Sequence, residues 1–277
     1  MKAQSDYSRT DSKSVELNVV NGNLEDKNLD EQFSSKMHTV NEGVGLENTI
    51  YTSRFTSEQE RVRSSSWRVL CRDFFQRYIL PSDTIVDIGA GDGLFLKNIR
   101  ASKKIAVDLS EHAKELEKHG IEVIQVSASQ FVKHLSGSVD VVFMSNFLEH
   151  LPNKAILLEV LAECRRALKP GGLILILQPN VRYAGSAYWD YIDHHIALTE
   201  HSLVEALQVT GFNIERVVPQ FVPYTAKSFA GSFSSWFNPE RVMEWYLRIP
   251  ILWRVFGGQT FVVASVVDEK KKNLGNN

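Results

Sequence analysis

The sequence predicts an α/β fold, a mostly parallel β-sheet with helices on both faces. Short runs of β-branched and other apolar residues alternate along the chain with stretches of helical periodicity, which is typical of strands joined by crossover helices. The strand candidates are nearly continuous apolar runs, as expected where helices cover both faces of a parallel sheet. The chain has 277 residues, of which 43% are hydrophobic, so it can build a substantial core.

The N-terminal part of the chain differs in composition from the rest. Residues 1–48 are rich in Ser, Asn, Asp, Glu and Lys and show no periodicity, which predicts a mobile polar tail. Residues 49–277 are expected to form the folded domain. Its first element is a helix over 57–79, because large apolar residues recur there at helical spacing before Pro81 ends the segment.

Five strands separated by helix-like stretches are expected in the middle of the chain. They are Thr84–Ile88, Ile105–Leu109, Ile121–Val126, Val139–Met144 and Leu173–Leu177. The clearest helix between them spans Lys154–Leu168, where apolar residues follow one face and a Lys-Pro-Gly-Gly sequence provides the stop. A later helix is expected at about Thr199–Thr210, with two more strands near Asn213–Val218 and Thr260–Val267.

The bulk composition disfavours several classes of protein. The net charge is −2, with 31 basic and 33 acidic residues, so no nucleic-acid partner is expected. Cys71 and Cys164 form neither a disulfide framework nor a zinc-binding spacing, and they suit a reducing compartment. No window approaches the ~20 apolar residues of a membrane span, and the polar start is unlike a signal peptide. We therefore expect a cytoplasmic protein without a transmembrane segment.

The segment TIVDIGAGDGLF at 84–95 is the first candidate for a binding site. It follows the first strand directly, and ligands of parallel α/β sheets bind at the carboxyl ends of the strands. Gly89, Gly91 and Gly93 let the backbone turn tightly and approach a ligand without a Cβ in the way. A tight strand-to-helix turn without a ligand is the alternative, since short motifs produce false matches.

The spacing of the glycines helps to identify the ligand. A dinucleotide-binding loop has the pattern G-x-G-x-x-G, but here Leu94 stands where the third glycine is required. No Gly-Lys-Ser/Thr follows, which argues against a P-loop. The second strand closes with Asp108, ~20 residues beyond the loop, a distance at which a carboxylate can accept both hydroxyls of a ribose. The pattern favours a nucleoside without a pyrophosphate.

Four segments form a combination that is more specific than any one of them. They are VDIGAGDG (86–93), AVDLS (106–110), SVDVVFMSNFLEHL (138–151) and RRALKPGGLILILQPN (165–180). In this order and spacing they resemble the class I S-adenosylmethionine-dependent methyltransferases. The resemblance implies a Rossmann-like fold with a seven-stranded sheet whose last strand, here Thr260–Val267, is antiparallel. It also implies S-adenosyl-L-methionine as the cofactor and methyl transfer as the reaction.

The resemblance also implies which residues bind the cofactor. They are Asp87, Gly89, Ala90, Gly91, Gly93, Asp108, Leu109, Ser127, Ala128 and Asn146. Asp87 and the glycine backbone would line the methionine part, Asp108 would hold the ribose hydroxyls, and Asn146 would lie near the reactive methyl group. Many members have an acidic residue after the third strand for the adenine amino group. This chain has Ser127-Ala128-Ser129 there, so a serine or a backbone group would make that contact.

Methyl transfer to a hydroxyl requires removal of the hydroxyl proton, and a histidine suits that role. His150 follows the fourth strand, while His194 and His195 follow Asp193 after the fifth. A carboxylate can orient a histidine base. We therefore expect the catalytic residues among His150, Asp193, His194 and His195, and His194 is the stronger candidate for the base than His195. The alternative is that these histidines only hydrogen-bond the backbone. Asp193 and its neighbours have metal-binding side chains, but the spacing predicts no metal site.

Two insertions outside the cofactor core are expected to contact the acceptor. They lie at about 181–198 and 219–258 and are rich in Tyr, Trp and Phe, although core packing or a homodimer interface also explains such residues. The run at 189–199 is similar to methyltransferases of bacterial gene clusters that modify surface polysaccharides and to ubiquinone-pathway relatives. We therefore expect a small-molecule or saccharide acceptor methylated on oxygen.

Other interpretations of the same residues remain open. The helix face with Arg61, Arg63 and Trp67 either closes over the site or is solvated, and the sequence favours the solvated face. The chain as a whole is alternatively an NAD-dependent oxidoreductase, which the glycine spacing disfavours, or a non-catalytic partner subunit that keeps the methyltransferase fold. The intact glycine loop and Asp108 argue against the partner subunit.

Overall fold

The computed structural model of the chain describes residues 56–224 and 238–267. The predicted polar tail at 1–48 lies outside the described residues, as does the middle of the expected insertion at 219–258. The division into a tail and a domain over 49–277 therefore stays a prediction. No described helix has both the length and the apolar character needed to cross a membrane.

The described residues are built around one seven-stranded sheet with the order β3-β2-β1-β4-β5-β7-β6. The strands are β1 (Thr84–Ile88), β2 (Lys103–Val107), β3 (Glu122–Ile124), β4 (Val139–Ser145), β5 (Leu168–Pro179), β6 (Phe212–Val218) and β7 (Gln259–Val266). Strands β1 to β5 pair in parallel, while β7 runs antiparallel to both of its neighbours, β5 and β6. The fold class predicted from the sequence, including the antiparallel last strand, is confirmed.

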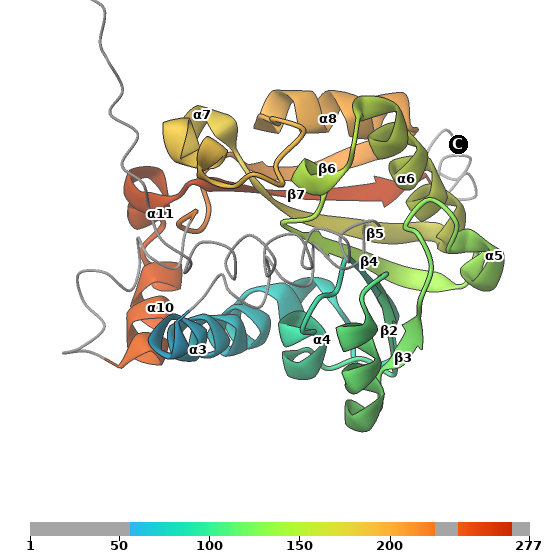
Figure 1. Cartoon of the computed structure of the whole chain (residues 1–277), viewed down its shortest axis with the longest axis horizontal. Helices are drawn as coiled ribbons and strands as arrows, with labels where there is room; N and C mark the ends of the chain where they lie inside the picture. The colour runs from blue at the N-terminus through green and yellow to red at the C-terminus, as the bar shows by residue number, and fades with distance from the viewer. Residues whose placement is uncertain (1–55, 225–237, 268–277) are drawn as a thin grey trace, which may run out of the picture. The chain divides into compact units, whose positions relative to one another are not determined.

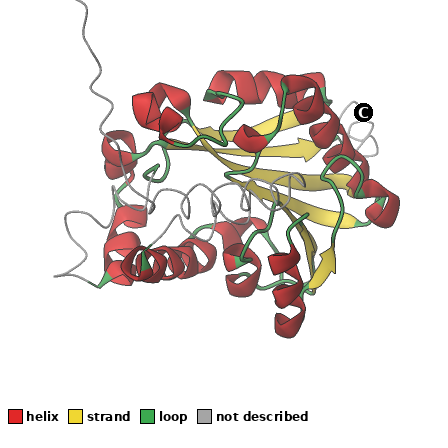
Figure 2. Cartoon of the chain, in the orientation of Figure 1, coloured by secondary structure: helices red, strands yellow, loops and turns green. Residues whose placement is uncertain are grey.

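Helices cover both faces of this sheet (Figures 1 and 2). The α-helices are α3 (Ser57–Asp73), α4 (Leu94–Asn98), α5 (Val132–Leu135), α6 (Lys154–Ala167), α7 (Val181–Ala184), α8 (Glu200–Val209), α10 (Pro239–Arg248) and α11 (Pro250–Phe256). Short 3₁₀ helices are η2 (Phe75–Tyr78), η3 (Glu111–His119), η4 (Leu148–His150) and η5 (Gly185–Asp190). Helices α5, α6 and α8 share one buried cluster with one face of the strands, and α3, α4 and α10 share another with the opposite face.

The strands divide their side chains between the two clusters by simple alternation. Val86 and Ile88 of β1 face the cluster of α6 and α8, whereas Ile85 faces the cluster of α3 and α4. All three side chains are fully buried, which explains why residues on both faces of the strand are apolar. The two cysteines sit in separate clusters, Cys71 on α3 and Cys164 on α6, and both are free and buried.

Two elements differ in extent from the sequence prediction. The helix expected over 57–79 ends at Asp73 and continues as η2. Phe74 and Phe75 are both buried, and adjacent residues of an α-helix cannot share one face, so the backbone changes course at Phe74. Strand β5 begins at Leu168, directly after α6, because Leu168 pairs with Val139 of β4. The Lys-Pro-Gly-Gly segment then forms an irregularity before Leu173 pairs with Val141.

The parallel strands bring several loops to one edge of the sheet. Ile88 pairs with Val107 of β2 and with Met144 of β4, and Val107 pairs in turn with Ile124 of β3. The carboxyl ends of these strands are thus level with one another. The segments that follow them, which hold most of the residues predicted to bind the cofactor, meet at this edge.

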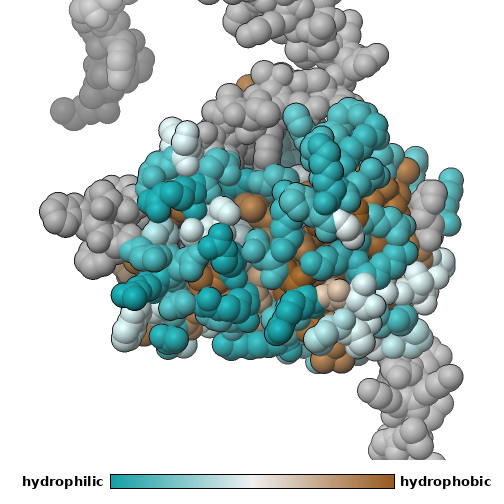
Figure 3. Space-filling view, turned by 90° about the horizontal axis from the view of Figure 1, so that it is seen from below, coloured by the Kyte–Doolittle hydropathy of each residue, from teal (hydrophilic) through white to brown (hydrophobic). Residues whose placement is uncertain are grey.

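The space-filling view from below shows how the helices on that side meet solvent. Most of the described surface there is hydrophilic, and hydrophobic residues show in limited areas between the polar ones (Figure 3). Exposed ion pairs such as Lys114 with Glu111, at 2.6 Å, contribute to such surfaces. Each exposed pair adds little stability, about 0–1 kcal/mol, so the fold depends on the two buried clusters.

Candidate functional site

The glycine loop after β1 requires its glycines for the turn itself. Gly89, Gly91 and Gly93 have φ of 70°, 53° and 68°, in the left-handed region that L side chains rarely adopt. A Cβ at Gly89 would lie 2.3 Å from the Phe147 ring, and one at Gly93 would lie 2.5 Å from the Leu116 side chain. The turn and its packing therefore account for these glycines without a ligand.

Asp108 is fixed against this loop. One carboxylate oxygen, Oδ2, accepts a hydrogen bond from the Gly91 N–H at 2.8 Å, and the other, Oδ1, accepts one from the Ser110 N–H at 2.8 Å. A carboxylate offers about four lone-pair positions, so both oxygens retain capacity for a ribose diol. The adjacent Leu109 side chain is 49% exposed, an unusual position for an apolar group and a suitable one for contact with a base.

Carboxyl groups gather around the end of β1. Asp87 is 4% exposed, and burial, followed by the nearby charges of Asp108 and Asp92, raises its pKa well above the usual range. Ala90, between the first two glycines of the loop, is also buried. A ligand that carries positive charge would favour the ionised form of Asp87 and so lower its pKa.

The loops after β3 and β4 place the remaining predicted cofactor residues. The Ser127 Oγ lies 3.2 Å from the Ser129 Oγ in a local turn, and Ala128 packs against the core. Asn146 is exposed and, with φ of 49°, is the only non-glycine residue of positive φ among those described. Such backbone strain is most often found at functional positions. Its Nδ2 donates to the Ser145 Oγ at 3.1 Å.

Helix α3 covers the glycine loop, which corrects the favoured prediction of a solvated helix face. The guanidinium of Arg63 is 16% exposed and pairs with Asp92 of the loop. Trp67 contacts the rings of Phe75, Phe95 and Phe143 at centroid distances of 6.0–6.4 Å. Of the three residues Arg61, Arg63 and Trp67, only Arg61 lies on a solvated face, where it pairs with Glu58 of the same helix.

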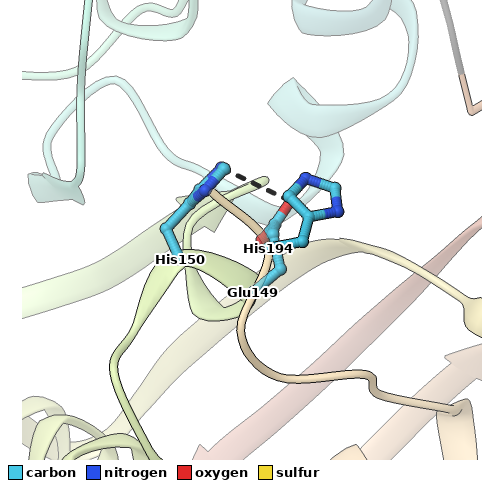
Figure 4. A group of neighbouring side chains, drawn as sticks. All are labelled: Glu149, His150 and His194. Atoms are coloured by element: carbon cyan, nitrogen blue, oxygen red, sulfur yellow. Dashed lines mark ion pairs between the residues drawn. The ribbon is translucent and has the colours of Figure 1, made fainter. Parts of the chain in front are cut away.

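A second group of polar side chains gathers where the loops after β4 and β5 meet. It consists of Glu149 and His150 on η4 and His194 in the loop after β5 (Figure 4). The N–H groups of His195 and Ile196 both donate to the Glu149 carbonyl oxygen, at 2.8 and 3.1 Å. These backbone bonds join the two loops and hold His194 opposite η4. We call Glu149, His150 and His194 the histidine cluster.

Both imidazoles of the histidine cluster are oriented by backbone carbonyls. The His150 Nδ1 lies 3.0 Å from the Asp193 carbonyl oxygen, and the His194 Nδ1 lies 2.8 Å from the Tyr188 carbonyl oxygen. Since a carbonyl oxygen only accepts, each Nδ1 donates, and each neutral ring keeps its lone pair on Nε2. The Asp193 carboxylate also approaches the His150 Nδ1, at 3.3 Å.

Glu149 is buried beneath the two rings. It is 1% exposed, and its Oε2 accepts a hydrogen bond from the Gln178 Nε2 at 2.9 Å. Burial raises the pKa of Glu149, although His150 and Gln178 oppose this effect. The Glu149 Oε1 lies 3.9 Å from the His150 Nε2, and one nitrogen of His194 lies within 4.8 Å of both the carboxylate and the His150 ring.

Aromatic rings surround His194 on its remaining sides. Tyr188 is fully buried at 4.6 Å from the imidazole, and Tyr191 lies at 5.2 Å. Tyr224 stacks on Tyr188 at 6.4 Å. His195 is exposed and belongs to none of these contacts. The structure thus brings His150, Asp193 and His194 together and separates His195 from them.

Comparison with known proteins agrees with this geometry. The family model described as "Methyltransferase domain" matches residues 61–217, more than half of the chain. The chain belongs to this methyltransferase family. The family predicted from the sequence, the S-adenosylmethionine-dependent methyltransferases, is confirmed.

Individual relatives of this methyltransferase are more distant. Ubiquinone biosynthesis O-methyltransferases of Pseudomonas paraeruginosa and Dechloromonas aromatica are 28% and 29% identical over 114 residues, which is 38% of this chain and 48% of each relative. The matched segment thus spans about half the length of these curated relatives. The crystal structure of a SAM-dependent methyltransferase from Archaeoglobus fulgidus superimposes with a TM-score of 0.54 at 24% identity and covers 79% of this chain and 99% of that one. This likeness shows the fold.

Sequence reasoning missed part of the methyltransferase site. Neither Glu149 nor Gln178 is among the site residues that the sequence predicts. A signal for Gln178 was present, because it interrupts the apolar run of β5 at a fully buried position. A buried polar side chain requires a partner, and here the partner is Glu149.

Proposed function

We propose that the protein transfers a methyl group from S-adenosyl-L-methionine to a hydroxyl of a small molecule. The observation that carries this proposal is the Asp108 carboxylate, fixed by the Gly91 N–H against a glycine loop of three positive-φ residues. The loop has no pyrophosphate-binding spacing, so a nucleoside is the ligand that fits. Family membership independently supports methyl transfer.

The residues around the loop fit this cofactor. Asp108 would hold the ribose hydroxyls, and the exposed Leu109 would contact the adenine. The carboxyl groups of Asp87, Asp92 and Asp108 lie where the positive charge of the cofactor would be stabilised. When bound, S-adenosylmethionine supplies a methyl group on a positively charged sulfur that leaves as a neutral thioether.

The histidine cluster is the proposed acceptor end of the site. Each Nδ1 donates to a carbonyl oxygen, so Nε2 is the nitrogen that would accept a proton in each ring. His194 would take the proton of the acceptor hydroxyl on Nε2 while the oxygen forms its bond to the methyl carbon. The ring of Tyr191, beside His194, would help to position the acceptor, and positioning of the reactants can lower the barrier by roughly 7–11 kcal/mol in favourable cases.

The choice of an oxygen acceptor rests on the relatives. The two relatives described above are named as O-methyltransferases of ubiquinone biosynthesis, and this supports a small hydroxylated molecule. A saccharide acceptor, a homodimer and a cytoplasmic location stay predictions. Neither the NAD-dependent oxidoreductase nor the non-catalytic partner subunit is favoured, because the family is that of methyltransferases and the polar groups of an acceptor site are present.

Calorimetric titration of the purified protein with S-adenosylmethionine and, separately, with NAD tests the cofactor. We expect binding of S-adenosylmethionine alone. Formation of S-adenosylhomocysteine is then followed with catechols, other phenols and saccharides as acceptors. Binding of NAD instead of S-adenosylmethionine would overturn the proposal, and cofactor binding without turnover of any hydroxylated acceptor would favour the partner-subunit interpretation.

A further inference from the structure

The histidine cluster has a second property beyond its capacity to accept a proton. Glu149, His150 and His194 each offer one donor atom, and all three donor atoms lie within 4.8 Å of one another. Figure 4 shows the Glu149 carboxylate between the two imidazoles, with the His150 ring directed towards it. Metal–ligand distances to nitrogen and carboxylate oxygen are ~2.0–2.2 Å, so small side-chain rotations bring the three donors to one ion.

The surroundings of the cluster are those of metal ligands. A metal-bound histidine usually donates its second ring N–H to a carbonyl or carboxylate, which fixes the tautomer and the ring plane. Both rings do so here, His150 to the Asp193 carbonyl oxygen and His194 to the Tyr188 carbonyl oxygen. The Glu149 carboxylate accepts from the Gln178 amide, as ligating carboxylates commonly do. Each of the three donor side chains thus has an outer partner of the kind that orients a metal ligand.

We propose that Glu149, His150 and His194 bind a divalent first-row transition-metal ion. Two imidazole nitrogens and one carboxylate form a ligand set found in zinc enzymes and in non-haem iron enzymes. Binding of the ion follows from the geometry of the chain alone. Its part in the reaction rests on the proposed function.

The donor set also excludes the commonest hard cations. Magnesium prefers six oxygen ligands in near-ideal octahedral geometry, whereas two of the three donors here are imidazole nitrogens. Zinc, iron, cobalt and nickel accept such nitrogens readily. The site therefore selects a transition metal over magnesium, in contrast to the sequence prediction of no metal.

Three protein ligands leave at least one coordination position open, as in catalytic rather than structural sites. The acceptor hydroxyl would occupy that position next to Tyr188 and Tyr191. An ion held there would lower the pKa of the bound hydroxyl, as metal ions do for bound water. Glu149, His150 and His194 would then hold the ion, and His194 would act as a ligand instead of as the proton acceptor.

The test uses the full chain without a histidine tag, freed of metal with a chelator. Zinc is titrated by calorimetry, and the zinc content is measured after gel filtration. We expect one zinc ion per chain and no comparable binding of magnesium. Glu149→Gln and His194→Ala should weaken zinc binding at least about 10-fold, since loss of outer partners alone costs 10–100-fold. His201→Ala, at an exposed histidine with 77% side-chain accessibility, should bind zinc as the wild type does.

Circular dichroism establishes that each variant is folded. If His194→Ala does not fold, His150→Ala replaces it, because the His150 side chain is 27% exposed and tolerates truncation better. Zinc affinity that is unchanged in Glu149→Gln and in the folded histidine variant would overturn the proposal, as would the absence of stoichiometric zinc in the wild type. A sample that binds S-adenosylmethionine but no zinc refutes the metal site alone, whereas zinc binding without cofactor binding refutes the proposed function alone.

Discussion

At the scale of single residues, Asp108 links the glycine loop to the proposed ribose site. Replacement of Asp108 by Ala removes two hydrogen-bond acceptors for the ribose and also the partner of the Gly91 N–H. Hydrogen bonds to a charged group contribute about 1.5–3 kcal/mol each. We expect the affinity for S-adenosylmethionine, measured by calorimetry, to fall at least about 10-fold. Asp190→Asn, at an exposed carboxylate, is the control, and equal affinity of the two variants would contradict the assignment.

The two adjacent histidines after Asp193 offer a matched comparison. His194 is 8% exposed and held by the Tyr188 carbonyl, while His195 is exposed. We expect His194→Ala to lower kcat about 10²-fold or more, the usual contribution of a general base, and His195→Ala to retain most of it. The measurement is the formation of S-adenosylhomocysteine with a turned-over acceptor. A larger loss in His195→Ala than in His194→Ala would reverse the assignment.

At the scale of elements, helix α3 shows that the sequence predicts where a helix begins but not which part of the protein the helix packs against. Its start follows from a capping box at Thr56 and Gln59, a signal readable in sequence. Its burial against the glycine loop was not predicted, because Arg63 looks like a surface residue until Asp92 lies beside it. Periodicity assigns a residue to a face, but only the packed structure identifies what that face contacts.

The other elements repeat this distinction between local and long-range information. Strands β1 and β4 were predicted nearly to the residue, because short apolar runs and the adjoining glycines are local signals. The start of β5 at Leu168 was not, since it depends on pairing with Val139 across 29 positions of sequence. Gln178 was not predicted for the same reason. Its partner, Glu149, comes close to it only through the pairing of β4 with β5.

The attachment of α3 to the sheet can be measured as stability. Trp67 joins the helix to η2, α4 and β4 through its three ring contacts. Trp67→Ala should lower the free energy of unfolding by about 2–4 kcal/mol, close to the range for large aromatic residues of a core. Trp245 is 61% exposed, so Trp245→Ala should cost less than about 0.5–1 kcal/mol. Urea denaturation measures both, and similar losses would show that α3 packs weakly.

At the scale of the whole molecule, the parallel sheet assembles a site from residues far apart in sequence. Asp87, Asp108 and Glu149 each follow or end a different parallel strand, and His194 arrives from the loop after β5. The sheet, and not proximity in sequence, brings these residues together, because the carboxyl ends of the parallel strands lie at one edge. This arrangement buries two carboxyl groups, Asp87 and Glu149, whose pKa values burial raises.

The buried carboxyl group of Asp87 predicts how stability depends on pH. Its pKa is raised in the folded chain and ~3.9 in the unfolded chain. Between these two values the folded state binds more protons than the unfolded state, so the stability contributed by Asp87 is fully present below about pH 4 and is lost as pH rises. The loss is about 1.4 kcal/mol per pH unit until the folded pKa is passed. In Asp87→Asn the group does not titrate, and this term is absent.

Urea denaturation of wild-type protein and Asp87→Asn across pH 4–8 tests this dependence. The variant should gain stability relative to the wild type with each step upward in pH, because only the wild type must then either hold a buried proton or bury a charge beside Asp108 and Asp92. Asp190→Asn, exposed to solvent, should show a constant difference over the same range. A constant difference for Asp87→Asn as well would mean that its carboxyl group is ionised in the folded state at every pH, and that the edge of the sheet holds negative charge without help from a bound cation.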